Sequence, residues 1–268
     1  MLAHVRRQKI IDLLKEDGSA KVIQLARLFK VTEVTIRQDL EKLEQEGLIF
    51  REHGGAYLKN LNENIQSFAP LNADNMDKKI SIGKKAASFV DSGDTIILDS
   101  GSTTTEIAKN LKGKKEITVI TNALNIALLL GGDSGIEVIV TGGEFKPPTI
   151  SLTGQKAADF FENIHVDKLF LASAGISLRA GLTYPSLSDI AVKKAMIDAA
   201  DITYLVADST KMGRNSLASL GALSLIDYII TDDTIDAKHL ELFKENEVEI
   251  ILTKSEKILS EQSAIKEV

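Results

Sequence analysis

Apolar residues in the first 58 positions recur every three or four residues, which is the spacing of one face of an α-helix. This pattern predicts helices at 5–16 and 22–29, and a third helix that begins after Thr32 and stops at Gly47. Thr32 has a hydroxyl suited to capping a helix start, and glycine is common just past a helix end. Two short apolar runs then flank His53-Gly54-Gly55 and predict a two-stranded hairpin.

From about residue 95 the pattern changes to short, continuous apolar runs separated by amphipathic or alanine-rich stretches. These runs predict strands at 95–99, 117–121, 137–141, 168–173, 203–208, 227–231 and 249–253. Apolar strands that alternate with helices are typical of a largely parallel sheet covered on both faces. The expected fold class is therefore an α/β main domain with an N-terminal winged helix-turn-helix domain.

The Asn-rich, weakly periodic stretch at 59–77 contains Pro70 and is expected to be a linker. It separates residues 1–58, called the head below, from residues 78–253, called the body. A C-terminal helical tail is expected at 254–268.

Composition excludes several kinds of function. The absence of cysteine excludes disulfides, thiolate metal sites and cysteine nucleophiles. The four histidines are scattered without an HExxH pair, so neither a metal nor a cofactor is expected. No apolar run approaches the roughly 18 residues of a membrane span, and the N-terminus has no signal-peptide core. We therefore expect a cytoplasmic protein without a membrane partner.

Charge is distributed unevenly. The chain carries a net charge of −6, but residues 1–60 hold 11 Lys and Arg against 9 Asp and Glu, so the acidic excess lies in the remainder. A mildly basic head on an acidic body is compatible with nucleic-acid binding confined to the head.

Two helices joined by a tight turn and followed by a hairpin predict a winged helix-turn-helix. In that geometry the start of the second helix enters the major groove, where Arg37 and Gln38 can hydrogen-bond and Val34 can contact a thymine methyl. The candidate DNA-binding residues are Thr32, Val34, Thr35, Arg37, Gln38, Arg51 and His53. Any small helical domain also shows an exposed polar face, so the pattern alone leaves both interpretations open.

A second polar cluster follows the predicted strand at 95–99. Asp99 ends the strand, and a Ser/Gly/Thr loop at 100–104 leads into a helix. Backbone amides at a helix start, together with hydroxyls, form an anion site suited to a sugar phosphate. It is not a Walker A loop, because Gly83-Lys84 and Gly113-Lys114 are both followed by lysine. An ordinary capped helix gives the same pattern, so the sequence alone does not decide between an anion site and a helix cap.

Other predicted strands end in polar residues or glycine, and ligands of open α/β sheets bind at the carboxyl ends of strands. The candidate effector-binding residues are Asp99, Ser100, Gly101, Ser102, Thr103, Thr104, Thr121, Asn122, Gly142, Gly143 and Lys211. Asn122 suits ligand hydroxyls and Lys211 suits negative charge, although a lone lysine is usually a solvated surface residue.

The head resembles the DNA-binding domain of the DeoR family of bacterial transcription regulators. The residues that fill the family signature are Arg6, Ile10, Leu14, Thr32, Thr35, Ile36, Arg37, Asp39 and Leu40, followed by Gly54-Gly55 after the wing. Among them, Asp39 is expected to bond within the head rather than to read DNA.

Residues 77–253 resemble the DeoR-family sensor domain through DSGSTT (99–104), VITN (119–122), TGGEF (141–145) and ADSTKMGR (207–214). That domain is similar to the ribose-5-phosphate isomerase and glucosamine-6-phosphate deaminase fold, in which the Ser/Thr loop holds the substrate phosphate. Two departures are Ala174, where many members have aspartate, and Pro147-Pro148, where many have basic residues.

The expected function is a sequence-specific transcription regulator, a repressor of a sugar-utilisation operon controlled by a phosphorylated sugar. Its expected partners are double-stranded operator DNA and further copies of itself, as a homodimer or homotetramer. The alternative is a sugar-phosphate isomerase or deaminase fused to a DNA-binding head, which would need a base over the bound sugar. Asp99 and Asp208 are candidates for that base, but no second acid/base group lies at a suitable spacing, so no catalytic residue is assigned.

Overall fold

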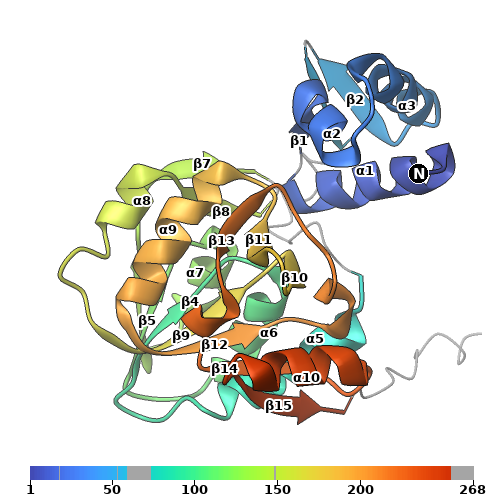
Figure 1. Ribbon diagram of the computed structural model, residues 1–268. Coiled ribbons are helices and arrows are strands. Elements are labelled where there is room, and N and C mark those ends of the chain that lie inside the picture. Colours follow the sequence, from blue (N-terminus) through green and yellow to red (C-terminus); the bar gives the residue numbers. More distant parts are fainter. Residues whose placement is uncertain (18, 53, 59–73, 148, 255–268) are drawn as a thin grey trace, which may run out of the picture.

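The computed structural model describes residues 1–17, 19–52, 54–58, 74–147 and 149–254, and it shows a small helical head beside a larger α/β body (Figure 1). Most of the expected linker, the expected C-terminal helical tail beyond residue 254 and the candidate residue His53 lie outside the described residues. In the described part of the chain, no helix is long and apolar enough to cross a membrane.

The head contains the three expected helices, α1 (Ala3–Asp17), α2 (Val22–Phe29) and α3 (Glu33–Gln45). Thr32 caps α3 as predicted, because its Oγ1 accepts a hydrogen bond from the Thr35 amide at 3.2 Å. Beyond the helix, Gly47 has a φ of 73°, a conformation that glycine adopts without a steric penalty.

The wing differs from the expected two-stranded hairpin. β2 (Ile49–Glu52) and β3 (Gly55–Leu58) pair as predicted, but β1 (Ser19–Lys21) adds a third antiparallel strand on the other side of β3. The sequence pattern predicts only a break between helices at these residues. A Cβ at Gly55 would lie 2.7 Å from the Ala20 carbonyl oxygen, so the close approach of β1 requires glycine at that position.

The head has its own core, which gathers apolar side chains from all three helices and the wing. Ile10 and Leu14 of α1 pack with Ile36 and Leu40 of α3. At the edge of this core, Arg6 Nε bonds Asp39 Oδ2 at 2.5 Å, and both side chains are more than nine-tenths buried. Asp39 therefore bonds within the head, as expected.

The body is built on one parallel sheet that contains all seven predicted strands. Their order across the sheet is β15-β14-β12-β9-β4-β5-β6. The strand bounds are β4 (Thr95–Leu98), β5 (Ile117–Thr121), β6 (Ile136–Val140), β9 (Val166–Ala172), β12 (Ala200–Val206), β14 (Tyr228–Asp232) and β15 (Glu249–Thr253).

Alternate side chains of these strands enter two separate cores, because successive residues of a strand point to opposite faces. On one face, Ile97 and Leu169 pack under α8 (Gln155–Asp159), α9 (Leu187–Asp198) and α10 (Ala237–Glu245). On the other face, Ile96 and Phe170 pack under α5 (Met76–Ala87), α6 (Ser102–Leu111) and α7 (Leu124–Leu130). Helices thus cover both faces of the sheet (Figure 1).

Short antiparallel elements that the pattern did not predict surround the carboxyl edge of the sheet. They are the hairpin of β7 (Glu144–Lys146) and β8 (Ser151–Thr153), and the small sheet of β10 (Gly175–Ser177), β11 (Gly181–Tyr184) and β13 (Ala218–Gly221). Each strand has three or four residues, too few for an alternating pattern to stand out.

Candidate functional site

The predicted DNA-reading residues of α3 lie at its start, on the side away from the head core. Val34, Arg37 and Gln38 are exposed, and residue Val34 keeps 60% of its accessible surface. Thr35 is half-buried, and its hydroxyl bonds that of Thr32 at 2.9 Å. These side chains face outward because Ile36 and Leu40, on the opposite face of α3, pack into the head core.

Both candidate arginines form ion pairs with carboxylates of the head. Arg37 Nη2 lies 2.8 Å from Glu33 Oε2, and Arg51 Nε lies 2.6 Å from Glu44 Oε2. Exposed pairs of this kind contribute only about 0–1 kcal/mol. A DNA phosphate or a guanine edge can therefore replace the carboxylate at little cost.

The Ser/Gly/Thr loop joins the carboxyl end of β4 to the N-terminus of α6. Ser100 and Ser102 are half-buried, whereas Thr103 and Thr104 are buried. The Thr104 hydroxyl donates to the Gly101 carbonyl at 3.0 Å, which fixes the shape of the first turn. The first amides of a helix have no partner within it, and the helix dipole places partial positive charge there. The loop can therefore hold an anion.

Asp99 is fully buried directly before this loop, and donors surround its carboxylate. Oδ1 accepts from the Ser100 amide at 2.7 Å, Oδ2 accepts from the Ala172 amide at 3.1 Å, and Lys193 Nζ lies 2.6 Å from each oxygen. The sequence predicts Asp99 as an effector contact and does not single out Lys193 as a site residue. In the structure Asp99 is bonded to the protein through both oxygens, so it shapes the loop.

Lys193 belongs to a larger buried charged cluster. Its Nζ lies 4.6 Å from the centre of the Tyr184 ring, and the Tyr184 hydroxyl donates to the Ala172 carbonyl at 2.6 Å. Burial, with smaller contributions from the charges of Asp99 and Asp189, raises the pKa of Tyr184 well above its usual value. Asp189 in turn pairs with Lys146 at 2.8 Å. Lys193 had one sequence signal, its position three residues before Met196 and next to Val192, both of which α9 buries.

Four buried side-chain oxygens have no hydrogen-bond partner among the described residues, and they belong to Asn122, Asn125, Asp208 and Thr231. Asn122 donates through Nδ2 to the Leu152 carbonyl at 3.0 Å, but its Oδ1 accepts nothing. Asn125 Oδ1, in the first turn of α7, and Asp208 Oδ2, just after β12, are in the same condition. An unsatisfied buried acceptor costs about 1–3 kcal/mol. Such groups suit a ligand that brings hydroxyl donors.

The remaining candidate effector-binding residues lie outside the loop at 100–104. Thr121 is buried and donates to the Leu98 carbonyl at 2.7 Å. A Cβ at Gly143 would lie 2.7 Å from the Thr153 carbonyl oxygen and 2.8 Å from Ala157, so this glycine lets the β7–β8 hairpin and α8 pack. Gly142, with a φ of 74°, faces open space. Lys211 follows β12, which is two strands from β4 and hence roughly 10 Å away.

Two family models match the chain. The DeoR-like helix-turn-helix domain matches residues 6–61, and the DeoR C terminal sensor domain matches residues 74–233. The chain belongs to the DeoR family. It is 34% identical to the putative aga operon transcriptional repressor of Escherichia coli, over 92% of this chain and 93% of that protein. It is also 34% identical to the HTH-type transcriptional repressor GlcR of Bacillus subtilis, over 96% and 98%.

These DeoR-family relatives are named as regulators and repressors, so this member is a DNA-binding transcription regulator and not an enzyme. Its fold class is the expected one, a helix-turn-helix head and an α/β body around a seven-stranded parallel sheet. Among solved structures, ribose 5-phosphate isomerase A from Methanocaldococcus jannaschii overlaps 52% of this chain and 55% of its own, with 16% identity and a TM-score of 0.39. This similarity is too low to assign a role to any residue of the candidate site.

Proposed function

We propose that this DeoR-family regulator represses a sugar-utilisation operon and is controlled by a phosphorylated sugar bound in the body. The observation that carries the proposal is the hydroxyl-rich start of α6, together with buried acceptors without partners just after β5 and β12. The names of relatives agree with it, because they include the lactose phosphotransferase system repressor of Lactococcus lactis and the glycerol-3-phosphate regulon repressor of Escherichia coli.

In the proposed effector site, one set of groups binds the phosphate and another binds the sugar hydroxyls. The loop at 100–104 and the α6 amides take the phosphate, and Lys211 adds positive charge from the side of β12. Asn122 and Asp208 accept hydrogen bonds from the sugar hydroxyls through their unpartnered oxygens. Gly142 leaves room beside Asn122, whereas Asp99, Thr121 and Gly143 hold the surrounding backbone in place.

The proposed DNA site is the start of α3, with Thr32, Val34, Thr35, Arg37 and Gln38 in the major groove and the wing, with Arg51 and His53, on the phosphates. A regulator of this kind reads two related half-sites, so a homodimer or homotetramer is part of the proposal. So is the division into a head at 1–58, a linker at 59–77, a sensor body at 78–253 and a tail at 254–268. Because the partner is DNA and the relatives are prokaryotic, the proposed compartment is the cytoplasm.

Thermal shift with a panel of phosphorylated sugars tests the effector site. The panel contains glucose 6-phosphate, fructose 6-phosphate, glucosamine 6-phosphate and glycerol 3-phosphate, with the unphosphorylated sugars as controls. A ligand at about 100 times its Kd stabilises the folded chain by about 2.7 kcal/mol, which raises Tm measurably. We expect a phosphorylated member to raise Tm and its unphosphorylated form to have no effect. If no member does so, the proposed effector class is wrong.

The double variant Thr103→Ala with Lys211→Ala is expected to lose the response to that sugar phosphate. Each hydrogen bond to a charged group is worth about 1.5–3 kcal/mol, so the affinity should fall about tenfold or more. Operator binding without the sugar should be unchanged. The matched control is Thr118→Ala with Lys238→Ala, which removes the same chemical groups at the amino end of β5 and in α10. A double variant that releases operator DNA at the wild-type sugar concentration would place the phosphate elsewhere.

A further inference from the structure

Helix α9 carries two buried charged residues, Asp189 and Lys193, that are four positions apart and so lie on one side of the helix. Lys193 is bonded to Asp99 at the start of the proposed effector loop. Asp189 is bonded to Lys146 on the β7–β8 hairpin. Helix α9 is therefore bonded both to the residue that precedes the effector loop and to the β7–β8 hairpin.

The β7–β8 hairpin is joined to α9 by more than this ion pair. The Gly154 amide, just after β8, donates to the Ser188 carbonyl in the first turn of α9 at 3.3 Å. The side chains of Lys146 and Asp189 are 13% and 8% exposed, so their pair is largely shielded from water. The shielded pair and the backbone bond beside it thus tie the hairpin to α9, and the two are treated below as one unit.

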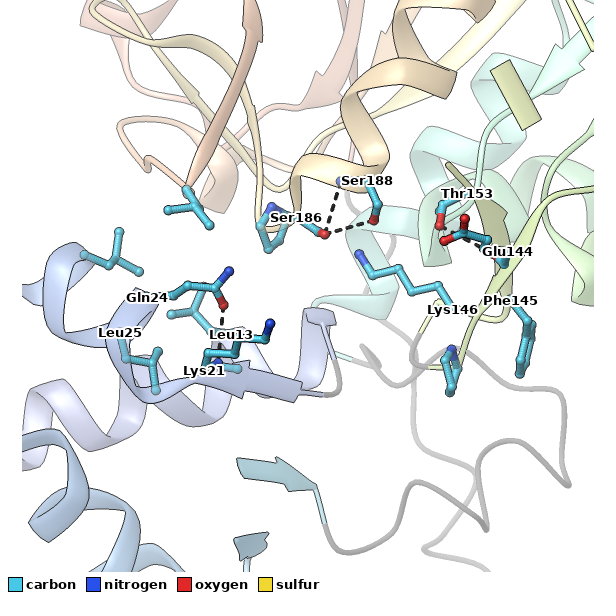
Figure 2. Close-up of a pocket in the computed structure, with 15 residues that line it drawn as sticks. Leu13, Lys21, Gln24, Leu25, Glu144, Phe145, Lys146, Thr153, Ser186 and Ser188 are labelled. Carbon is cyan, nitrogen blue, oxygen red and sulfur yellow. Dashed lines mark hydrogen bonds between the residues drawn. The ribbon is translucent and has the colours of Figure 1, made fainter. Parts of the chain in front are cut away.

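This unit faces the DNA-binding head across a cavity of about 410 Å³. Figure 2 shows Lys21, Gln24 and Leu25 of the head on one side, Glu144 to Lys146 of the hairpin on the other, and Ser186 and Ser188 at the start of α9 above them. The head surface at this cavity belongs to β1, α2 and Leu13 of α1. Helix α2 packs on α3, which holds the proposed DNA-reading residues. A displacement of the hairpin therefore changes the surface that faces the head across this cavity.

We propose that α9 and the β7–β8 hairpin are the element that couples the effector site to the DNA-binding head. This inference rests on the proposed function, since it assigns the route by which the bound sugar acts. A sugar phosphate on the loop at 100–104 favours one position of Asp99, and Lys193 transfers that preference to α9. The Asp189–Lys146 pair then carries it to the hairpin and so to the head. The sugar has an effect because it binds one of two arrangements more tightly.

The test removes the second ion pair without leaving a buried charge alone, in the variant Lys146→Met with Asp189→Leu. Neither residue belongs to the proposed sugar or DNA contacts, so both affinities should stay within about twofold of wild type. Allosteric coupling typically changes affinity about 5–150-fold. We expect the probe, whichever panel sugar phosphate raises the wild-type Tm most, to change operator Kd by that order in wild type and by less than about threefold in the variant.

The matched control is Lys168→Met with Asp94→Leu. This pair is equally shielded, at 15% and 13% exposure, but it joins β9 to the turn before β4, at the amino end of the sheet and away from the hairpin. The control should respond to the probe as wild type does. If the control loses the response as well, general loosening explains the result and the proposed route is wrong.

A second measurement needs no sugar. The chain has no cysteine, so Gln24→Cys and Glu144→Cys introduce two clean labelling sites across the cavity. Spin-label distances should be narrowly distributed in wild type and in the Lys168→Met, Asp94→Leu control, and broad in the Lys146→Met, Asp189→Leu variant. Equal widths in all three overturn the inference. If no probe affects operator binding by the wild-type protein, the proposed effector class is wrong. If the Lys146→Met, Asp189→Leu variant responds to the probe as wild type does, only the proposed coupling route is wrong.

Discussion

Gln38→Ala and Arg37→Ala are each expected to weaken binding to the operator by about tenfold or more while leaving the head folded. A bidentate contact to a base edge is worth about 1–3 kcal/mol, and both side chains project from the start of α3 into solvent. Arg37 first has to leave Glu33, which costs little because the two side chains are 60% and 43% exposed. The operator is obtained by selecting tight binders from random duplexes, and affinity is measured by mobility shift.

The matched control for this prediction is Gln45→Ala. It removes the same side chain from the same helix, but Gln45 is the last residue of α3, more than a turn beyond the proposed groove contacts. We expect wild-type affinity for Gln45→Ala. Arg51→Ala should weaken all duplexes alike and reduce the salt slope by about one, because its proposed partner is a phosphate. Unchanged affinity in both Arg37→Ala and Gln38→Ala would show that α3 does not read the operator.

Arg6→Ala is expected to unfold the head. The Arg6–Asp39 pair is buried, with side-chain exposures of 8% and 6%, and removing one partner leaves the other charge without compensation. Breaking such a pair costs about 3–5 kcal/mol, which is much of the stability of a small domain. Hydrogen exchange should show loss of protection in α1 and α3 and retained protection in the strands of the body.

The double variant Arg6→Met with Asp39→Leu separates charge from packing. Replacing a buried ion pair by apolar side chains of similar size is often neutral or stabilising, so the head should regain protection from exchange. It should also regain operator binding, because neither side chain is a proposed DNA contact. A head that stays folded in Arg6→Ala would mean that the pair contributes little, and a double variant that stays unfolded would mean that its geometry matters more than its charge.

The sequence determined the elements whose signals are local. Ile36 and Leu40 at helical spacing, with the hydroxyl of Thr32 before them, were sufficient to predict α3 and its cap. The seven strands of the body were predictable because each is a short, largely apolar run, which is typical of a sheet buried on both faces. The Ser/Gly/Thr loop was found for the same reason, since a strand end, a loop and a helix start follow one another directly in the chain.

Tertiary structure decided what depends on residues distant in sequence. β1 is three residues long and becomes a strand only because β3 offers it backbone partners and Gly55 admits it. Lys193 lies 94 positions from Asp99, and nothing near either residue indicates that they meet. The same holds for the buried oxygens of Asn122 and Asp208, whose lack of partners follows from what packs around them. A local pattern records the preference of a segment, whereas an ion pair or an unsatisfied acceptor arises only when packing brings separate segments together and excludes water.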